Sequence, residues 1–359
     1  TSPRYVTKTN DGSCWFTNEN LCIEKIDSSF DIYDAKSHEV VFSGSLIEGV
    51  KDPVSGDKVY YADFSQFNKK GSYYICVPGS GKSYSFQIED NVYGNTQKAL
   101  LKALYFQRCG CSLDKKHAGL YSHDICHTKI SKLLENPSVE IDATGGWHDA
   151  GDYGKYITPA ATTIGHLLYA YKLFASSFEE LTLIPESGNG VPDILNECRY
   201  ELEWMLKMQD KDSGGVYHKV TTLRHADFIM PEKDTEQMYV FPVSSLATAD
   251  FAASMALAYD VFKTVDLSFA NSMKEAALLA GTWLEKNPQF VPAPDNPPNG
   301  NTGLYDNNSD LDERLWAASE LYGITEDKKY QQLFLSLLES VKSIDYGWEN
   351  VSGLGILAY

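Results

Sequence analysis

Positive charge is scarce in this chain of 359 residues, because 31 lysines and arginines face 49 aspartates and glutamates. The formal net charge of -18 repels phosphate backbones and anionic lipid surfaces, so we expect neither nucleic acid nor membrane as a partner. No apolar run approaches the roughly eighteen residues that a membrane-spanning helix needs. Residues 1–4 also lack the basic-then-apolar pattern of a signal peptide, which favours a soluble, mature or trimmed product.

Cysteine is limited to seven residues, an odd number that cannot pair completely within one chain, so a disulfide framework is not indicated. Three of them, Cys14, Cys22 and Cys76, lie early in the chain, and Cys198 stands alone. The middle group consists of Cys109, Cys111 and Cys126, followed by His127, with His117 and His123 nearby.

Thiol and imidazole groups gathered in one short segment favour a tetrahedral zinc site, for which Cys109, Cys126 and His127 are the first candidates. The alternative is that Cys109 ends an amphipathic helix as a small buried apolar residue, while the histidines lie on a solvated loop.

The pattern of apolar residues changes once along the chain. Up to about residue 90, short runs alternate in the manner of strands at 29–34, 40–42, 58–64, 71–77 and 83–88. This pattern predicts a small β-sandwich over residues 1–90, with a first strand that is weakly marked or lost. Residues 91–359 have helical periodicity, which predicts about seven helices, at 96–107, 160–175, 192–208, 246–262, 269–284, 312–321 and 329–341.

The most informative segment spans residues 145–156 and carries two carboxylates three residues apart, Asp149 and Asp152. Trp147, Tyr153 and Tyr156 flank them with flat aromatic faces, and glycines in the segment permit tight backbone turns. Two carboxylates between aromatic rings can hold and activate a water molecule beside a sugar. The alternative is an acidic surface turn, because aspartates are mostly exposed.

Two further segments contain candidate functional groups. Residues 305–313 place acidic and amide oxygens just before a helix, which indicates either a calcium site or a helix-capping cluster. His218 follows a glycine-rich turn at the end of a predicted helix, and we interpret it as either a sugar contact or a structural histidine.

Several blocks of the chain closely resemble family 9 glycoside hydrolases, the cellulase family with an (α/α)6 barrel. The matching blocks are residues 145–156, 184–195, 204–209 and 242–253, and they occur in the family's order. Residues 63–65 and 71–74 resemble the immunoglobulin-like domain that precedes the barrel in one branch of that family. The resemblance implies an immunoglobulin-like β-sandwich at 1–90, followed by a partial (α/α)6 barrel at 91–359.

The resemblance also implies an activity, namely inverting hydrolysis of β-1,4-glucosidic bonds in cellulose or related β-glucans by a secreted endoglucanase. Asp152 matches the general base that deprotonates the attacking water, and Asp149 matches the carboxylate that helps to hold it. We expect Trp147, Tyr153, Tyr156 and His218 to form the walls that face the sugar. The alternatives are a non-catalytic carbohydrate-binding remnant and an exo-glycosidase that acts on another β-linked sugar.

Inversion needs a second carboxyl group about 6.5–9.5 Å away to protonate the leaving oxygen. In the family this acid is a glutamate near the end of the barrel, and this chain has no counterpart of it. We therefore expect the chain to be C-terminally incomplete. The missing part of the barrel is either a separate piece associated with this chain or absent from this sequence, and the chain alone is expected to be inactive.

The resemblance also implies two metal sites, and this chain matches most of their ligands. Cys109, Cys126 and His127 match zinc ligands of the branch with the immunoglobulin-like domain, whose fourth ligand is a histidine close behind the catalytic base. This chain has Lys155 there, so we expect His148 or His123 to replace that histidine. A calcium loop of the family is matched by Asn308, Ser309, Asp312 and Glu313. Both metals are expected to be structural.

Overall fold

A computed structural model of the chain describes residues 4–9, 28–54, 56, 58–179 and 181–359. The chain divides into two compact units, Thr1–Asn95 and Thr96–Tyr359, so the division lies five residues after the predicted position. Cys14 and Cys22 lie outside the described residues. In the described part of the chain, none of the helices has the length and apolar character that crossing a bilayer requires.

The first unit is an immunoglobulin-like β structure in which the long strand β3 pairs with strands on both of its sides. The strand order is β1-β4-β3-β2-β5-β6, and β7 pairs with β5. The first half of β3 is antiparallel to β2 and its second half is antiparallel to β4. The strands are β1 (Arg4–Thr9), β2 (Ser29–Asp34), β3 (Val40–Lys51), β4 (Lys58–Asp63), β5 (Gly71–Val77), β6 (Gly81–Lys82) and β7 (Phe86–Ile88).

Alternation of apolar and polar residues explains the core of this unit. Phe30 and Ile32 of β2, together with Tyr73 and Ile75 of β5, point to the same buried side, because side chains of a strand alternate between its two faces. The strand that the sequence marks weakly is β1, which pairs along its whole length with β4.

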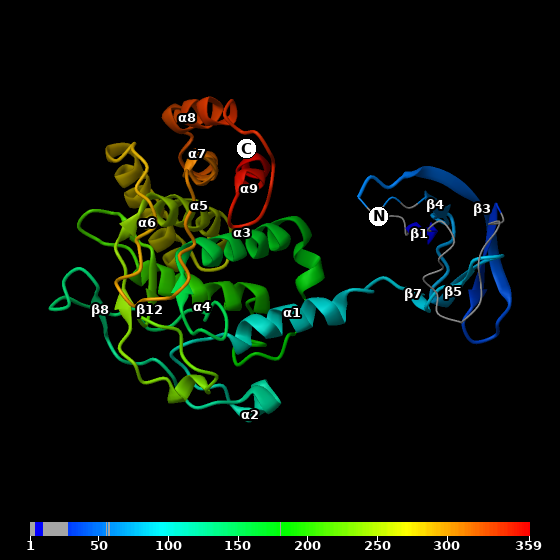
Figure 1. Cartoon of the computed structure of the whole chain (residues 1–359), viewed down its shortest axis with the longest axis horizontal. Helices are drawn as coiled ribbons and strands as arrows, with labels where there is room; N and C mark the ends of the chain where they lie inside the picture. The colour runs from blue at the N-terminus through cyan, green and yellow to red at the C-terminus, as the bar shows by residue number, and fades with distance from the viewer. Residues whose placement is uncertain (1–3, 10–27, 55, 57, 180) are drawn as a thin grey trace. The chain divides into compact units, whose positions relative to one another are not determined.

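The second unit is helical, and α5 lies at its centre with nearly every residue buried (Figure 1). A helix that is apolar on all sides must be covered on all sides, and α5 packs against α3, α6 and α7. In turn, α7 packs against α8 and α9. The helices are α1 (Gly94–Phe106), α2 (Lys115–Ala118), α3 (Ile157–Phe174), α4 (Asp193–Lys207), α5 (Ser245–Phe262), α6 (Leu267–Lys286), α7 (Leu311–Thr325), α8 (Lys328–Leu338) and α9 (Ser352–Ala358).

Short strands join the long loops between these helices, and the candidate site lies on these loops. Five strands form one sheet in the order β10-β12-β13-β8-β9, and β11 pairs with β14. The strands are β8 (Ser131–Leu133), β9 (Glu140–Ile141), β10 (Lys155–Tyr156), β11 (Val216–Tyr217), β12 (Lys219–Thr221), β13 (Tyr239–Val240) and β14 (Val243–Ser244).

Candidate active site

Asp149 and Asp152 lie on the loop between β9 and β10. The Asp149 N–H donates to the carbonyl of Gly154 at 2.9 Å, which closes the loop on itself. Tyr153 has a positive φ of 58°, a conformation that is uncommon for a residue with a side chain and that tightens the turn after Asp152. The loop therefore holds both carboxylates in one compact turn.

A tyrosine hydroxyl holds each carboxylate. Tyr305 donates to Oδ2 of Asp149 at 2.6 Å, and Tyr156 donates to Oδ2 of Asp152 at 2.9 Å. The two tyrosine rings lie against each other, with centroids 4.7 Å apart, so the two pairs form one cluster.

The two oxygens of Asp152 have different surroundings. Nδ1 of His225 lies 3.2 Å from Oδ2, the oxygen that already accepts from Tyr156. Oδ1 is buried and has no hydrogen-bond partner among the described residues. Asp152 thus has one hydrogen-bonded oxygen and one buried oxygen without a hydrogen-bond partner among the described residues.

Asp149 differs from Asp152 in its electrostatics. Its side chain is partly open to solvent, yet desolvation of the carboxyl raises its pKa above the ordinary value. The negative charge of Asp152 raises this pKa further, whereas the Tyr305 hydrogen bond opposes the rise. The two carboxylates therefore interact electrostatically.

A cavity of about 700 Å³ lies beside this cluster, and His225 forms part of its wall. The lining is polar and apolar in equal parts and comes mainly from the loop that precedes β13 and from the loop that precedes α7. Its other residues include Arg224, Asp227, Asp234, Tyr239 and Asn299.

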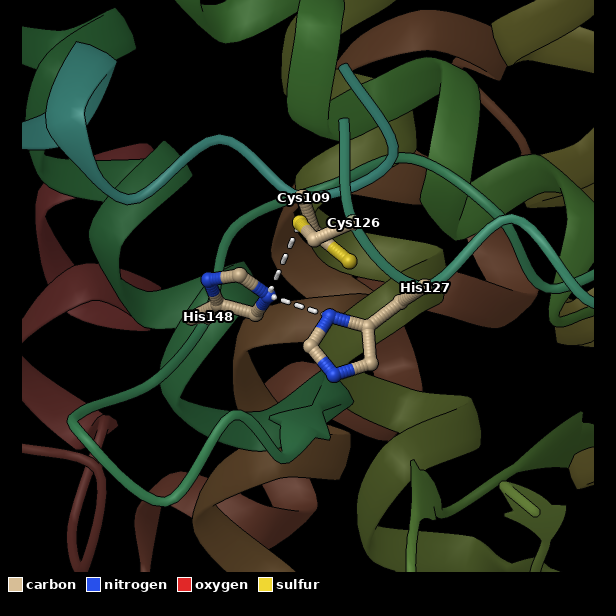
Figure 2. Close-up of side chains that lie close together, drawn as sticks. All are labelled: Cys109, Cys126, His127 and His148. Atoms are coloured by element: carbon tan, nitrogen blue, oxygen red, sulfur yellow. Dashed lines mark hydrogen bonds between the residues drawn. The ribbon is translucent and has the colours of Figure 1, made fainter. Parts of the chain in front are cut away.

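Four buried or half-buried side chains close to the carboxylate loop converge on one point (Figure 2). The possible ligand atoms of Cys109, Cys126, His127 and His148 all lie within 4.8 Å of one another. Nε2 of His148 is 3.2 Å from Nδ1 of His127 and 3.9 Å from Sγ of Cys126. Two thiols and two imidazoles at this spacing fit a tetrahedral metal site. His148 thus joins the three residues predicted from the sequence, whereas Nδ1 of His123 faces the carbonyl of Asp124.

The surroundings prepare these ligands for a metal. Nε2 of His127 lies 3.3 Å from a carboxylate oxygen of Asp234, which leaves Nδ1 directed at the cluster. The pKa of the Cys109 thiol is held well below its ordinary value, first by the hydrogen bond from Cys126 and further by the charge of Lys155. The thiolate is the form that binds metal ions.

The predicted calcium residues lie around the start of α7. Oδ2 of Asp312 accepts from the N–H of Val351 at 2.8 Å, and Oγ of Ser309 accepts from the N–H of Leu311 at 3.3 Å. Glu313 is buried, and its Oε2 has no partner among the described residues. Asn308 is exposed, and its backbone N–H bonds the side chain of Asn307.

Asp250 of α5 adds a third carboxylate to this region. It is fully buried, and neither of its oxygens has a partner among the described residues. Burial, and then repulsion by Asp312, raises the pKa of Asp250. Burial, followed by repulsion from Asp250 and Asp312, raises that of Glu313. Unpartnered buried carboxylates are the kind of oxygen donors that a hard cation satisfies.

Comparison with known proteins identifies the family. The family model Glycosyl hydrolase family 9 matches residues 93–359, and the model Cellulase N-terminal ig-like domain matches residues 21–82. The chain belongs to glycosyl hydrolase family 9. Its second unit is accordingly the first part of an (α/α)6 barrel that follows an immunoglobulin-like domain.

Relatives share both parts of this family 9 chain. A cellodextrinase of Butyrivibrio fibrisolvens is 39% identical over 353 residues, which cover 92% of this chain and 63% of the relative. Endoglucanase D of Acetivibrio thermocellus is 40% identical over 328 residues, covering 89% of this chain and 52% of the relative. A metagenome-derived family 9 endoglucanase matches with a TM-score of 0.84 and 35% identity, over 99% of this chain and 65% of that one. The chain thus spans between half and two thirds of the length of these relatives.

Two of the predicted sugar-facing residues are buried supports in this family 9 chain. The Trp147 side chain is only 7% exposed, and its Nε1 donates to Glu197 at 2.8 Å. His218 is fully buried between Oγ of Ser244 and the carbonyl of Leu304. Complete burial contradicts the sugar contact predicted for His218. Trp147 lines a cavity of about 110 Å³ together with Asp149, so its sugar contact stays a prediction.

The two predicted tyrosine walls also have other contacts. Tyr156 is buried and its hydroxyl donates to Asp152. It also lines the same cavity as Asp149, so its assignment as a wall stays a prediction. Tyr153 is half-buried, its hydroxyl donates to the carbonyl of Ile229, and its ring lies against His127 and His148. Tyr153 therefore covers the metal cluster and retains only part of its surface for a ligand.

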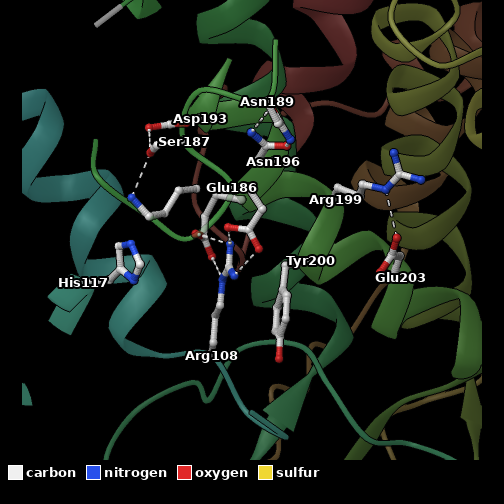
Figure 3. A network of polar contacts seen from close by, with 12 residues as sticks. Arg108, His117, Glu186, Ser187, Asn189, Asp193, Asn196, Arg199, Tyr200 and Glu203 are labelled. Carbon is white, nitrogen blue, oxygen red and sulfur yellow. Dashed lines mark hydrogen bonds and ion pairs between the residues drawn. The ribbon is translucent and has the colours of Figure 1, made fainter. Parts of the chain in front are cut away.

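Sequence reasoning missed an ion network that supports Trp147, and Figure 3 shows its contact between Arg108 and Glu186. Arg108 is buried and bonds Glu186 at 2.9 and 3.1 Å and Glu197 at 3.1 and 3.0 Å. Its guanidinium also lies over the Tyr200 ring, 4.4 Å from the centroid. Glu197 thereby connects Arg108 to the indole of Trp147, two residues before Asp149. A planar cation with five donors suits this double carboxylate contact.

Tyr305, His225 and Asp234 were also missed, although each touches a predicted site residue. Tyr305 lies within the acidic segment that was interpreted only for metal binding. His225 and Asp234 come from a loop without helical or strand periodicity. Only their distances to Asp152 and His127 reveal them.

Proposed function

We propose that this chain carries the water-activating half of a glycoside hydrolase that cleaves β-1,4-glucosidic bonds in cellulose or related β-glucans with inversion. One observation carries the proposal, namely the two carboxylates that are each held by a tyrosine hydroxyl, with Oδ1 of Asp152 buried and unpartnered. Relatives named cellodextrinase, endoglucanase D and xyloglucan-specific endo-β-1,4-glucanase support this substrate class and endo action.

In the proposed reaction, Oδ1 of Asp152 takes a proton from a water molecule that Asp149 helps to hold. The Tyr156 hydroxyl already donates to Oδ2, so we assign the proton to the other oxygen. The water oxygen then attacks the anomeric carbon, and a second carboxylic acid protonates the leaving oxygen. We assign that acid to the remaining part of the barrel, outside residues 1–359.

That remaining part is also the proposed partner of this chain. Large apolar side chains on α8, on α9 and at the residue directly after α9 are 40–52% exposed, which favours their coverage by further protein. They are Leu333, Leu335, Leu357 and Tyr359. We further propose that the protein is secreted, acts on carbohydrate, and binds neither nucleic acid nor membranes, in keeping with its net charge of -18.

We propose a structural zinc at Cys109, Cys126, His127 and His148. The donor set fits this metal, and the four residues would fix its coordination without leaving a position for substrate. A related solved structure is described as a Zn-binding triple mutant of a family 9 endoglucanase. We also propose structural calcium at Asn308, Ser309, Asp312 and Glu313, supported by the unpartnered oxygen of Glu313.

The hydrolysis proposal is tested with Asp152→Asn in the full-length gene product that contains this chain. Release of reducing sugar from a soluble cellulose derivative should fall by about 10²- to 10⁴-fold, because the proton acceptor is lost. The control is Asp142→Asn, which removes an exposed carboxylate of the same loop that pairs only with Lys207 and with Thr144. Near-normal turnover by a folded Asp152→Asn variant contradicts the role.

Two measurements separate the alternatives. Tight binding of cello-oligosaccharides in calorimetry, without any reducing sugar from the wild-type gene product, supports a carbohydrate-binding remnant. Release of single sugar units from chain ends supports an exo-glycosidase. Initial formation of the α-anomer, followed by NMR, supports inversion.

A further inference from the structure

A fully buried lysine lies beneath the carboxylate cluster. Lys219 of β12 donates through Nζ to Oδ1 of Asn296 at 3.0 Å, Oγ1 of Thr302 at 3.2 Å and the carbonyl of Gly303 at 2.6 Å. An ammonium group has three donors, so these partners use all of them. A buried charge is costly unless it is hydrogen-bonded, so this arrangement strongly favours one position of the loop before α7.

His218 holds the next residue of the same loop. Its Nε2 lies 2.7 Å from the carbonyl oxygen of Leu304, and its Nδ1 lies 2.8 Å from Oγ of Ser244. A carbonyl oxygen can only accept, so Nε2 carries the proton and Nδ1 accepts from the serine. His218, directly before β12, and Lys219, the first residue of β12, therefore bind residues 302–304 in succession.

The residue that follows this anchored stretch is Tyr305. Its φ of 49° is unusual for a tyrosine and persists only where the surroundings determine it. Its hydroxyl donates to Asp149 at 2.6 Å. The anchor thus controls the approach of the phenol to the carboxylate.

We propose that Lys219 is a positioning residue that, together with His218, fixes residues 302–304 so that Tyr305 holds Asp149 in place for hydrolysis. This inference rests on the proposed function and adds a role for two buried residues that touch no substrate. Lys219 acts through the loop, and Tyr305 acts on the carboxylate.

The test compares Lys219→Met, Tyr305→Phe and the double variant in the full-length gene product. A displacement of about 1 Å at a catalytic group can cost up to about 10²-fold, so we expect each single change to lower kcat by about 10- to 100-fold with KM nearly unchanged. Because both act through one hydrogen bond, the double variant should be no slower than the slower single variant. Independent, multiplying losses, or an unchanged kcat in Lys219→Met, would overturn the proposal.

Gln209→Met is the matched control. Gln209 is likewise buried and anchors two carbonyls, those of Gly214 and Ala276, but it does not contact residues 302–304. The Gln209→Met variant should have a lower free energy of unfolding and an unchanged kcat. If Lys219→Met does not fold, Thr302→Val removes one of the three acceptors and should give a smaller loss of kcat in the same direction, and no loss would overturn the proposal.

A spectroscopic measurement does not depend on activity. In protein labelled with 3-fluorotyrosine, the ¹⁹F signal of Tyr305 is assigned by its disappearance in Tyr305→Phe. It should shift or broaden in Lys219→Met and keep its position in Gln209→Met. If the wild-type gene product is inactive but the ¹⁹F signal still shifts in Lys219→Met and not in Gln209→Met, the proposed function is contradicted and the positioning role of Lys219 stands. If the ¹⁹F signal does not move in Lys219→Met, the positioning role itself is rejected.

Discussion

At the scale of single residues, the two carboxylate oxygens of Asp152 differ in their hydrogen bonding. The Tyr156 hydroxyl donates to Oδ2, and Nδ1 of His225 lies 3.2 Å from the same oxygen without forming a hydrogen bond. Oδ1 is buried without a partner among the described residues. A buried polar atom without a partner is costly, and such costs concentrate at functional positions. The asymmetry therefore favours proton transfer to Oδ1.

His218 gives the first pH-dependent expectation. Burial lowers its pKa from an ordinary 6.5 to about 4, so the folded protein keeps the ring neutral. Between these two values the unfolded chain binds a proton that the folded chain excludes. The free energy of unfolding should therefore fall as pH decreases from 6.5 to 4, by up to about 3 kcal/mol.

Urea unfolding at pH 7 and pH 4.5 measures this loss, and His218→Gln should remove most of it. The control is His166→Gln, which changes an exposed histidine on α3. An equal decrease in the wild type and in His218→Gln would show that other groups cause the loss.

The residue types in the sequence indicated which chemical groups gather at the candidate site, but they did not indicate which of these side chains are buried. The two aspartates and three residues of the proposed metal site could be named because the roles proposed for them depend on their chemical groups and spacing. The orientation of Trp147 and His218 depends on partners far along the chain, such as Glu197 and Leu304. Local sequence contains no signal for these contacts, so their burial was not predictable.

At the scale of elements, helical periodicity predicted the long helices, but some of the predicted helix ends differ from those in the structure. α3 begins at Ile157, three residues before the predicted start, because β10 leads directly into it. The last residue of α7 is Thr325, four residues beyond the predicted end at 321. The helix is capped by Glu326, which adopts a left-handed φ of 57° in the position where glycine is common. α2 and α9 span four and seven residues, too few turns for a periodic signal.

The contact between α3 and α7 provides a second pH-dependent expectation. Glu320 of α7 is buried and accepts hydrogen bonds from the Tyr169 hydroxyl of α3 and from Nε1 of Trp316. Burial raises its pKa from 4.5 to about 7, even though both bonds oppose the rise. The folded protein therefore binds a proton more tightly than the unfolded chain does.

The effect of pH on stability through Glu320 is opposite in direction to the effect through His218. The contribution of Glu320 to stability should be greatest below pH 4.5 and should be lost as pH rises to 7, by about 3 kcal/mol. Glu320→Gln keeps a neutral side chain at every pH, so it should gain stability relative to the wild type between pH 5 and pH 7. Urea unfolding across this range measures the gain, with the exposed Glu339→Gln as the control. A constant difference between wild type and Glu320→Gln at all pH values would refute the expectation.

At the scale of the whole molecule, the metal cluster joins segments that are distant in sequence. Cys109 follows α1, Cys126 and His127 lie in the loop before β8, and His148 lies directly before Asp149. The sequence indicated the ligand types, but it left two candidates for the fourth position. Only the folded loops decide in favour of His148. Likewise, periodicity predicted the helices, whereas their arrangement as part of a barrel came from resemblance to the family.

Metal removal should therefore loosen the loops of the helical unit. The proposed zinc binds only the folded arrangement of its ligands, so its binding free energy adds to stability. A loss of about 3–5 kcal/mol corresponds to a fall in Tm on the order of 10 °C for a unit of this size. Differential scanning calorimetry before and after treatment with a strong chelator measures this shift.

Two cysteine variants separate a metal effect from a packing effect. Cys126→Ser removes a ligand, and it should abolish the bound zinc, measured by elemental analysis, together with the Tm difference between treated and untreated protein. Cys111→Ser changes a half-buried thiol outside the cluster and should retain both. Calcium measured in the same samples should be unaffected by either cysteine variant, because its proposed ligands lie at the start of α7. A chelator-sensitive Tm that persists in Cys126→Ser would place the stabilising metal elsewhere in the molecule.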